Sequence, residues 1–225
     1  MKPLGHKSYG SIPHLSNSRL GIGDHHIEKG QEEIATKKAR DWKDLIIVQE
    51  KLDGSNVSVA KISGEIIALG RAGYLAQSSP YKQHQLFAYW VRQNEERFRL
   101  LLAEGERVVG EWLALAHGTK YNLKHEPFVA FDLMVGYERA CYLNFVFRTI
   151  PLEFTIPKLI HIGQPISVKR VLEKLEPSGH GAIDPVEGAI WRVERENKVD
   201  FLCKYVRQDK IDGCYLEDDI WNWLP

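Results

Sequence analysis

A stretch of short apolar runs in the first third of the chain constrains its fold most strongly. The run Leu45–Val48 is typical of a buried strand. A second run, Val57–Ile62, is followed by Ser63-Gly64 and by a third run, Glu65–Gly70. Ser-Gly between two such runs indicates a hairpin. The stretch therefore predicts antiparallel strands, and it leaves Lys51-Leu52-Asp53-Gly54 on a bend between paired strands.

The rest of the chain mixes further strands with few helices. Apolar spacing predicts helices over residues 31–43, 80–102 and 167–175. Strand patterns cover residues 107–115, 128–135, 188–193 and 201–204. Because helices and strands do not alternate regularly, the pattern favours an α+β fold with largely antiparallel sheets flanked by helices. Residues 1–30 show no period, so we expect an irregular N-terminal arm.

Length and composition limit the class of protein. A chain of 225 residues makes one large domain or two small ones, and we expect a single domain over residues 1–225. Its 30 basic and 30 acidic residues cancel, so a nucleic acid would have to be held by a local patch. Three cysteines without CxxC spacing fit a reducing compartment, and no run is long enough to span a membrane. We expect a cytoplasmic protein.

Lys51 is the candidate nucleophile. A free lysine is protonated at neutral pH, so a nucleophilic lysine must be desolvated or held near cations that lower its pKa. Lys204, Arg71 and a bound metal could supply those cations. Gly54 would let a phosphate approach the backbone, and Asn56 offers a side-chain donor. A lysine before Asp-Gly is weak evidence alone, because Asp-Gly is also a common turn.

Four further motifs follow Lys51 along the chain, and their order carries the specificity. Motif I of the covalent nucleotidyltransferases, lysine-x-Asp-Gly, matches Lys51–Gly54. Motifs III, IIIa, IV and V of that superfamily match, in this order, Val109–Trp112, Phe128–Asp132, Glu187–Ile190 and Phe201–Lys204. Over about residues 46–206, the chain therefore resembles the superfamily of ATP-dependent DNA ligases, RNA ligases and mRNA capping enzymes. It is most similar to the RNA ligases.

The resemblance implies a nucleotidyltransferase (ATP-grasp-like) domain and a role for each matched residue. Lys51 would attack the α-phosphorus of ATP and carry AMP. Glu111 would hold the ribose hydroxyls, Phe131 would stack on the adenine, and Glu187 would serve a divalent metal, Mg²⁺ or Mn²⁺. Glu50 would face the base edge. Further nucleotide and phosphate contacts are implied for Asp53, Gly54, Asn56, Arg71 and Lys204.

The activity implied by the resemblance is ATP-dependent RNA ligation. AMP would pass from Lys51 to an RNA 5′-phosphate, and a neighbouring 3′-hydroxyl would displace it. The residue inventory agrees, because phosphoryl transfer requires positioning and cations more than acid–base chemistry. Three alternatives stay open: a DNA nick-sealing enzyme, a GTP-using nucleotidyltransferase, and a non-catalytic relative that binds nucleotide or RNA.

The chain departs from the family pattern near its C-terminal end. Leu202 stands where many relatives have the first of two lysines in motif V. Only 21 residues follow Lys204, so we expect no C-terminal OB or helical appendage. RNA contact would then come from the domain, from residues 1–30 or from a partner protein. Arg207–Lys210 resembles motif VI of capping enzymes, but it follows motif V so closely that we interpret it as coincidence.

Overall fold

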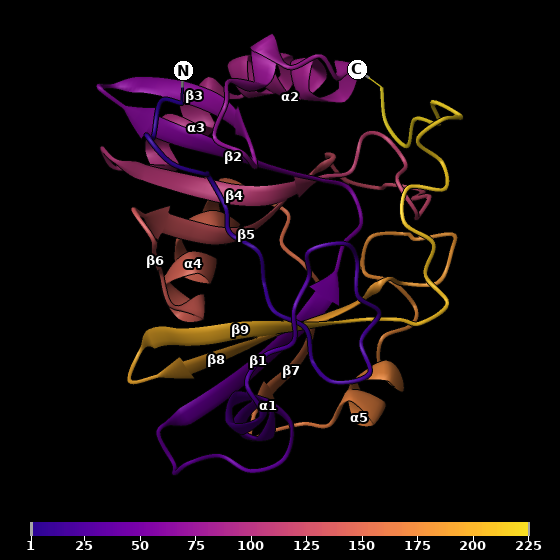
Figure 1. Ribbon diagram of the computed structural model, residues 1–225. Coiled ribbons are helices and arrows are strands. Elements are labelled where there is room, and N and C mark those ends of the chain that lie inside the picture. Colours follow the sequence, from indigo (N-terminus) through magenta and orange to yellow (C-terminus); the bar gives the residue numbers. More distant parts are fainter. Residues whose placement is uncertain (1, 225) are drawn as a thin grey trace.

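Two antiparallel sheets, stacked one above the other, form the frame of the computed structural model, which describes residues 2–224 (Figure 1). The strands are β1 (Asp44–Lys51), β2 (Ser55–Ile62), β3 (Glu65–Gly70), β4 (Glu106–Trp112), β5 (Phe128–Val135), β6 (Glu138–Arg139), β7 (Leu159–Gly163), β8 (Gly188–Arg195) and β9 (Lys198–Val206). One sheet has the order β3-β2-β4-β5-β6, and the other has the order β7-β1-β8-β9. The predicted α+β class with antiparallel sheets is confirmed.

The strands on either side of Lys51-Leu52-Asp53-Gly54 belong to different sheets. β1 pairs with β7 and β8, whereas β2 pairs with β3 and β4. The prediction that Lys51 lies on a bend between paired strands is therefore wrong. The connection crosses from one sheet to the other, and this crossing places motif I at the junction of the two sheets.

Within the described residues, five α-helices cover the outer faces of the sheets or lie between them (Figure 1). They are α1 (Lys29–Thr36), α2 (Lys82–Gln93), α3 (Glu95–Leu101), α4 (Tyr142–Thr149) and α5 (Val168–Leu172). The helix predicted over residues 80–102 is broken at Asn94, because its side-chain amide donates to the Trp90 carbonyl and its backbone leaves the helical region. The sequence prediction omitted α4, β6 and β7.

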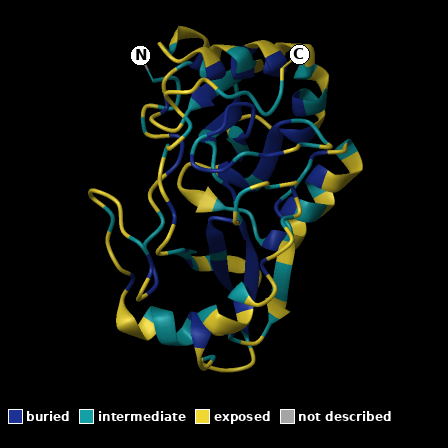
Figure 2. Ribbon diagram, turned by 90° about the vertical axis from the view of Figure 1, so that its right-hand side faces the viewer, coloured by how far each residue is buried: buried dark blue, intermediate teal, exposed yellow. Residues whose placement is uncertain are grey.

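Two main cores support the sheets, whose buried segments are dark blue in Figure 2, and the core of the five-stranded sheet also includes Ile47 of β1. The aromatic side chains of α2 and α3 pack on the five-stranded sheet, where Phe87, Trp90 and Phe98 contact Trp112 and Phe128. α1 and α5 contribute to the second core, which surrounds the fully buried Trp191 of β8. Among residues 2–224, no helix has the length and apolar character needed to cross a membrane.

A buried ion pair connects the two sheets. Asp132 of β5 forms the pair with Arg192 of β8, and both side chains are at most 4% exposed. Tyr9 donates its hydroxyl to the other carboxylate oxygen of Asp132 at 2.7 Å. Arg139 donates to that same oxygen at 3.1 Å. A buried carboxylate with this many partners is well compensated, and it holds β5, β8 and the N-terminal arm together.

The N-terminal arm lies along the outer edge of β9. Residues 2–28 contain no helix or regular strand, but the backbone of Lys204 donates to Pro13 and accepts from Leu15. The amide of Arg19 donates to the Val206 carbonyl at 3.0 Å. Leu15 is fully buried in the second core. The arm therefore supplies a pairing partner for β9 beside the motif V lysine.

Replacing Asp132 tests the connection between the sheets. Asp132→Ala leaves Arg192 buried without its main partner, which typically costs about 3–5 kcal/mol. We expect urea unfolding to show a loss of this size. Glu138→Ala, at an exposed position on the neighbouring β6, serves as the control and should change the free energy of unfolding by less than about 0.5 kcal/mol. Equal unfolding midpoints for Asp132→Ala and the wild type would contradict the role of the pair.

Candidate active site

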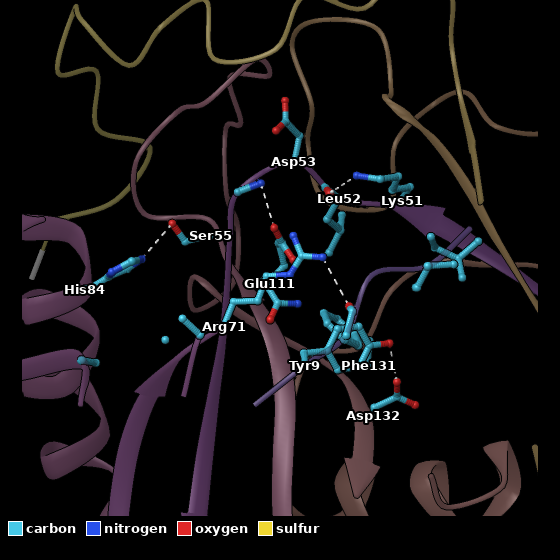
Figure 3. Close-up of a pocket in the computed structure, with 18 of the residues that line it drawn as sticks. Tyr9, Lys51, Leu52, Asp53, Ser55, Arg71, His84, Glu111, Phe131 and Asp132 are labelled. Atoms are coloured by element: carbon cyan, nitrogen blue, oxygen red, sulfur yellow. Dashed lines mark hydrogen bonds between the residues drawn. The ribbon is translucent and has the colours of Figure 1, made fainter. Parts of the chain in front are cut away.

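A cavity of about 720 Å³ lies where the chain crosses between the two sheets (Figure 3). Its size is ordinary for a small-molecule site. Nine of the ten site residues predicted from the sequence line it. These are Glu50, Lys51, Asp53, Gly54, Asn56, Arg71, Glu111, Phe131 and Lys204. The tenth, Glu187, contacts the ammonium of Lys51.

Lys51 is the last residue of β1, and it lines the cavity. Its ammonium donates to the Glu187 carboxylate and, at 3.4 Å, to the Leu52 carbonyl. Its side chain is 20% exposed. Register explains the pairing, because Lys51 lies directly opposite Gly188 of β8, next to Glu187.

The charge around Lys51 is mainly negative. Burial lowers the pKa of Lys51, but the carboxylates of Glu187, Asp53 and Glu111 outweigh burial and raise the pKa above its ordinary value. The expectation that neighbouring cations lower this pKa is therefore wrong for this arrangement. The structure holds Lys51 in its protonated form, and an attack by its amine requires a change in the charge that faces it.

Glu111 of β4 lies at the centre of the cavity wall. One of its carboxylate oxygens accepts a hydrogen bond from the Gly54 amide at 3.1 Å. Burial, together with the nearby charges of Glu187 and Asp53, raises its pKa to about 8 despite the opposing effect of Lys51. Asn56 lies opposite Glu111 on β2, and within the described chain its side-chain oxygen has no hydrogen-bond partner. An unpaired acceptor at a cavity wall is suited to binding a ligand.

Two glycines permit close backbone approaches at the site. A Cβ at Gly54 would lie 2.5 Å from the Trp112 carbonyl oxygen, and a Cβ at Gly188 would lie 1.9 Å from that of Tyr205. Both contacts are too short for any side chain. These positions in motifs I and IV therefore require glycine for packing within the protein, whatever ligand the site binds.

Asp53 turns away from the centre of the cavity. Figure 3 shows its carboxylate directed away from Arg71, Glu111 and Phe131. It accepts a hydrogen bond from the Gly118 amide at 2.9 Å and pairs with the Lys210 ammonium at 2.8 Å. The predicted nucleotide contact of Asp53 stays a prediction, and its contacts here are within the protein.

Two predicted phosphate-binding cations contact the N-terminal arm. Lys204 of β9 lies 3.6 Å from the Asp24 carboxylate, and burial, followed by the charge of Lys51, lowers its pKa. Arg71, just after β3, is exposed and donates to the Gly10 carbonyl at 3.3 Å. Long cationic side chains held by such partners can move to an incoming phosphate.

The ring of Phe131 stands at the cavity wall from β5. It packs edge to face against Tyr9, with ring centroids 5.4 Å apart (Figure 3). Tyr9 is in turn fixed by Asp132. The arrangement leaves Phe131 half-buried on a rigid support, as a base-stacking residue requires.

Glu50 is more deeply buried than the other predicted contacts. Its two carboxylate oxygens accept hydrogen bonds from the Ser178 hydroxyl and the Gly179 amide. Burial raises its pKa in spite of these bonds. The side chain lines the cavity, and its facing of a base edge stays a prediction.

Several residues near the cavity were not identified as site residues from the sequence. His84 of α2 and His117 both place Nε2 near the Ser55 hydroxyl, at 3.3 and 3.4 Å. Burial, followed by the charge of His117, lowers the pKa of His84, so it is neutral near pH 7. Asp132 and Arg192 also line the cavity. Only Asp132 carried a sequence signal, as the last residue of motif IIIa.

The donor set is compatible with a magnesium-type ion. Within residues 2–224, no three His, Cys, Asp or Glu side chains form a ready-made metal cluster. Mg²⁺ usually binds one or two carboxylates together with substrate phosphates and water. Burial raises the pKa of Glu111, and the nearby charge of Glu187 adds to the shift. A cation bound with phosphates beside these two carboxylates would favour their ionised forms.

A family model of RNA ligases matches residues 44–206, which is most of the chain. The chain belongs to the RNA ligase family. The match begins with β1 and ends with β9, so it includes both sheets and all ten predicted site residues of this RNA ligase family member. No curated protein sequence matches the chain significantly.

Solved structures with a similar fold are also ligases. A Naegleria gruberi RNA ligase with PPi has a TM-score of 0.58 at 16% identity, over 94% of this chain and 57% of that chain. A variant of Naegleria gruberi RNA ligase with ATP and Mn has a TM-score of 0.54 at 13% identity, over 92% and 60%. An Aquifex aeolicus protein described as an ATP-dependent DNA ligase has a TM-score of 0.51 at 15% identity, over 88% and 49%. The chain thus spans about half the length of these proteins, and the likeness shows the fold alone.

The raised pKa of Glu111 predicts an unusual pH dependence of stability. The folded state favours the protonated carboxyl, so this group destabilises the fold as pH rises from about 4.5, its ordinary value, to about 8. Glu111→Gln mimics the protonated form. We expect its free energy of unfolding, relative to the wild type, to increase between pH 5 and pH 8 in urea titrations.

Glu106 of β4 provides a control of opposite sign. Hydrogen bonding by Arg148 lowers the pKa of Glu106, so its ionised form stabilises the fold at every pH above its ordinary value. Glu106→Gln should be less stable than the wild type at both pH 5 and pH 8, with little change between them. A constant difference for Glu111→Gln over this range would contradict the raised pKa of Glu111.

Proposed function

We propose that this chain is an ATP-dependent RNA ligase that works through a lysyl-AMP intermediate, with the chain acting as one adenylyltransferase domain. The observation that carries the proposal is the gathering of the predicted residues at one cavity. They come from strands of both sheets, and a chance match of local motifs would not bring them together. The family membership and the ligase fold support the same reaction class.

In the first step, the Lys51 amine forms a bond to the α-phosphorus of ATP, and the bond from that phosphorus to pyrophosphate breaks. Lys204 would contact the α-phosphate, and Arg71 would contact the phosphates that leave as pyrophosphate. Phe131 would stack on the adenine, and Glu111 would bind the ribose hydroxyls. Because bound phosphates would add negative charge near Glu187 and Glu111, a divalent cation would offset it.

Glu187 is the proposed ligand for that cation, Mg²⁺ or Mn²⁺. The bound ion would neutralise phosphate charge and weaken the pull of Glu187 on the Lys51 proton. The Naegleria gruberi variant of the same fold, with ATP and Mn, supports this choice of nucleotide and metal. Glu187 would then release Lys51, with which it pairs in this structure, and the ammonium would lose a proton to solvent before the amine attacks.

The two later steps consume the intermediate. An oxygen of an RNA 5′-phosphate attacks the phosphorus of lysyl-AMP, and the bond to Lys51 breaks. A 3′-hydroxyl then attacks the 5′-phosphate, forms the phosphodiester and releases AMP. RNA specificity would come from the surface of this domain or from a partner protein. Sealing of RNA by the purified chain alone would favour the first source.

Intact-mass measurement after incubation with ATP and Mg²⁺ tests the first step. The wild type should gain the mass of one AMP, and Lys51→Ala should gain none, because Lys51 is the proposed nucleophile. Lys198→Ala, at an exposed position on β9, is the matched control and should be adenylated normally. Adduct formation by Lys51→Ala would overturn the assignment of the nucleophile.

The mass measurement and a strand-sealing assay separate the alternatives. An adduct with GTP in place of ATP would indicate a different nucleotide. Sealing of nicked DNA in preference to nicked RNA would indicate a DNA ligase. Retained ATP binding without any adduct would indicate a non-catalytic relative. Leu202, which lines the cavity in place of a motif V lysine, is the observation that favours this last alternative.

A further inference from the structure

Lys210 is a buried cation that lies beyond the residues matched by the family model. Its side chain is largely inaccessible, and the residue is 9% exposed. Its ammonium pairs with the Asp53 carboxylate at 2.8 Å and donates to the Gly118 carbonyl and the Thr119 hydroxyl. A lysine ammonium has three donors, and all three have acceptors here. The environment is therefore built for a lysine.

The partner of Lys210 is the acid of motif I. Asp53 follows the nucleophile by two residues, and its carboxylate also accepts from the Gly118 amide at 2.9 Å and the Thr119 hydroxyl at 3.3 Å. The backbone amide of Asp53 donates to the Tyr121 hydroxyl at 3.0 Å. These hydrogen bonds join Asp53 to the loop of residues 118–121 and fix the turn that follows Lys51.

Packing at Gly118 shows how closely the three segments meet. A Cβ at this position would lie 2.4 Å from the Ile211 carbonyl oxygen, 2.8 Å from an Asp53 carboxylate oxygen and 3.1 Å from Cε of Lys210. Only glycine fits between them. The motif I turn, the loop after β4 and the C-terminal segment are thus in direct contact at a single point.

The C-terminal segment that carries Lys210 has its own anchors. Tyr215 and Ile220 make backbone hydrogen bonds to His117 and Ala116, at 2.8 and 2.9 Å. The Asn222 side chain accepts from the Tyr121 amide and donates to the Leu113 carbonyl. Lys210 is therefore presented from a segment that is fixed independently of Asp53.

We infer that Lys210 is a positioning residue for the lysyl-AMP step, held against Asp53 to fix the motif I turn and the direction of Lys51. The inference rests on the proposed function for its catalytic consequence. The pair also keeps the carboxylate of Asp53 turned out of the cavity, away from the place where phosphates would bind. Lys210 acts through Asp53 and touches no reacting atom.

Hydrogen exchange tests, without reference to activity, whether the Lys210–Asp53 pair fixes the motif I turn. Lys210→Met keeps the length and removes the charge, and we expect faster amide exchange in the peptide covering residues 51–56. Arg207→Met is the matched control, because Arg207 pairs on the surface with Asp209 in the same segment. It should exchange like the wild type. Asp53→Asn breaks the same pair from the other side and serves if Lys210→Met does not fold.

Single-turnover adenylation measures the catalytic consequence. Misplacement of a nucleophile by about 1 Å costs on the order of 100-fold in rate. Lys210→Met should slow lysyl-AMP formation by about 10- to 100-fold and change the ATP concentration for half-maximal rate by less than about threefold. In the double variant with Asp53→Asn, the loss should not exceed that of the slower single variant, because both changes break one pair.

The outcomes separate this inference from the proposed function. Absence of an adduct in the wild type would refute the proposed function. The exchange data would still show whether the Lys210–Asp53 pair fixes the turn at residues 51–56. Unchanged exchange at residues 51–56 in both Lys210→Met and Asp53→Asn would overturn the inference. The inference would also be overturned if the rate loss of the double variant equalled the product of the two single losses. That result would mean that Asp53 makes a separate contact with the nucleotide.

Discussion

The ion pair between Asp132 and Arg192 is the contact on which the rest of the site depends. The candidate site is assembled from two sheets, whose cores are largely separate apart from Ile47 of β1, which packs in the core of the five-stranded sheet. Residues on β1, β8 and β9 can meet residues on β2, β4 and β5 only if the sheets are held at a fixed separation. Asp132 and Arg192 do this at the cavity wall, directly beside Phe131. Structural support and ligand site thus share the same residues.

The charge balance around Lys51 gives the site its second property. The carboxylates of Glu187, Asp53 and Glu111 raise the pKa of Lys51, whereas burial lowers the pKa of Lys204. Such surroundings favour the protonated form of Lys51. In the proposed reaction, activation of Lys51 would therefore depend on phosphate and metal ligands that change this charge balance.

The sequence predicted which residues lie together at the cavity better than the connections between them. The order of the motifs selected Lys51, Glu111, Phe131 and Lys204, which line the cavity, and Glu187, which contacts Lys51. Their roles stay predictions. The assignment of β1 and β2 to different sheets could not be predicted, because strand partners are chosen by contacts distant in sequence. For the same reason, the pairing of Asp53 with Lys210 was missed, and Lys210 was interpreted as part of a coincidental motif. Break points such as Asn94 depend on one side-chain hydrogen bond and were also missed.

The pairing of the N-terminal arm with β9 has a consequence for the family-matched segment. Within the four-stranded sheet, β9 has β8 on one side only, and residues 13–19 bond to its other side. A fragment cut at residues 44 and 206 would keep every motif, but it would present the free backbone of an edge strand beside Lys204. Exposed edges of this kind recruit strands from other molecules. The arm therefore covers this edge, and the segment that the family model matches is smaller than the unit in which the edge of β9 is paired.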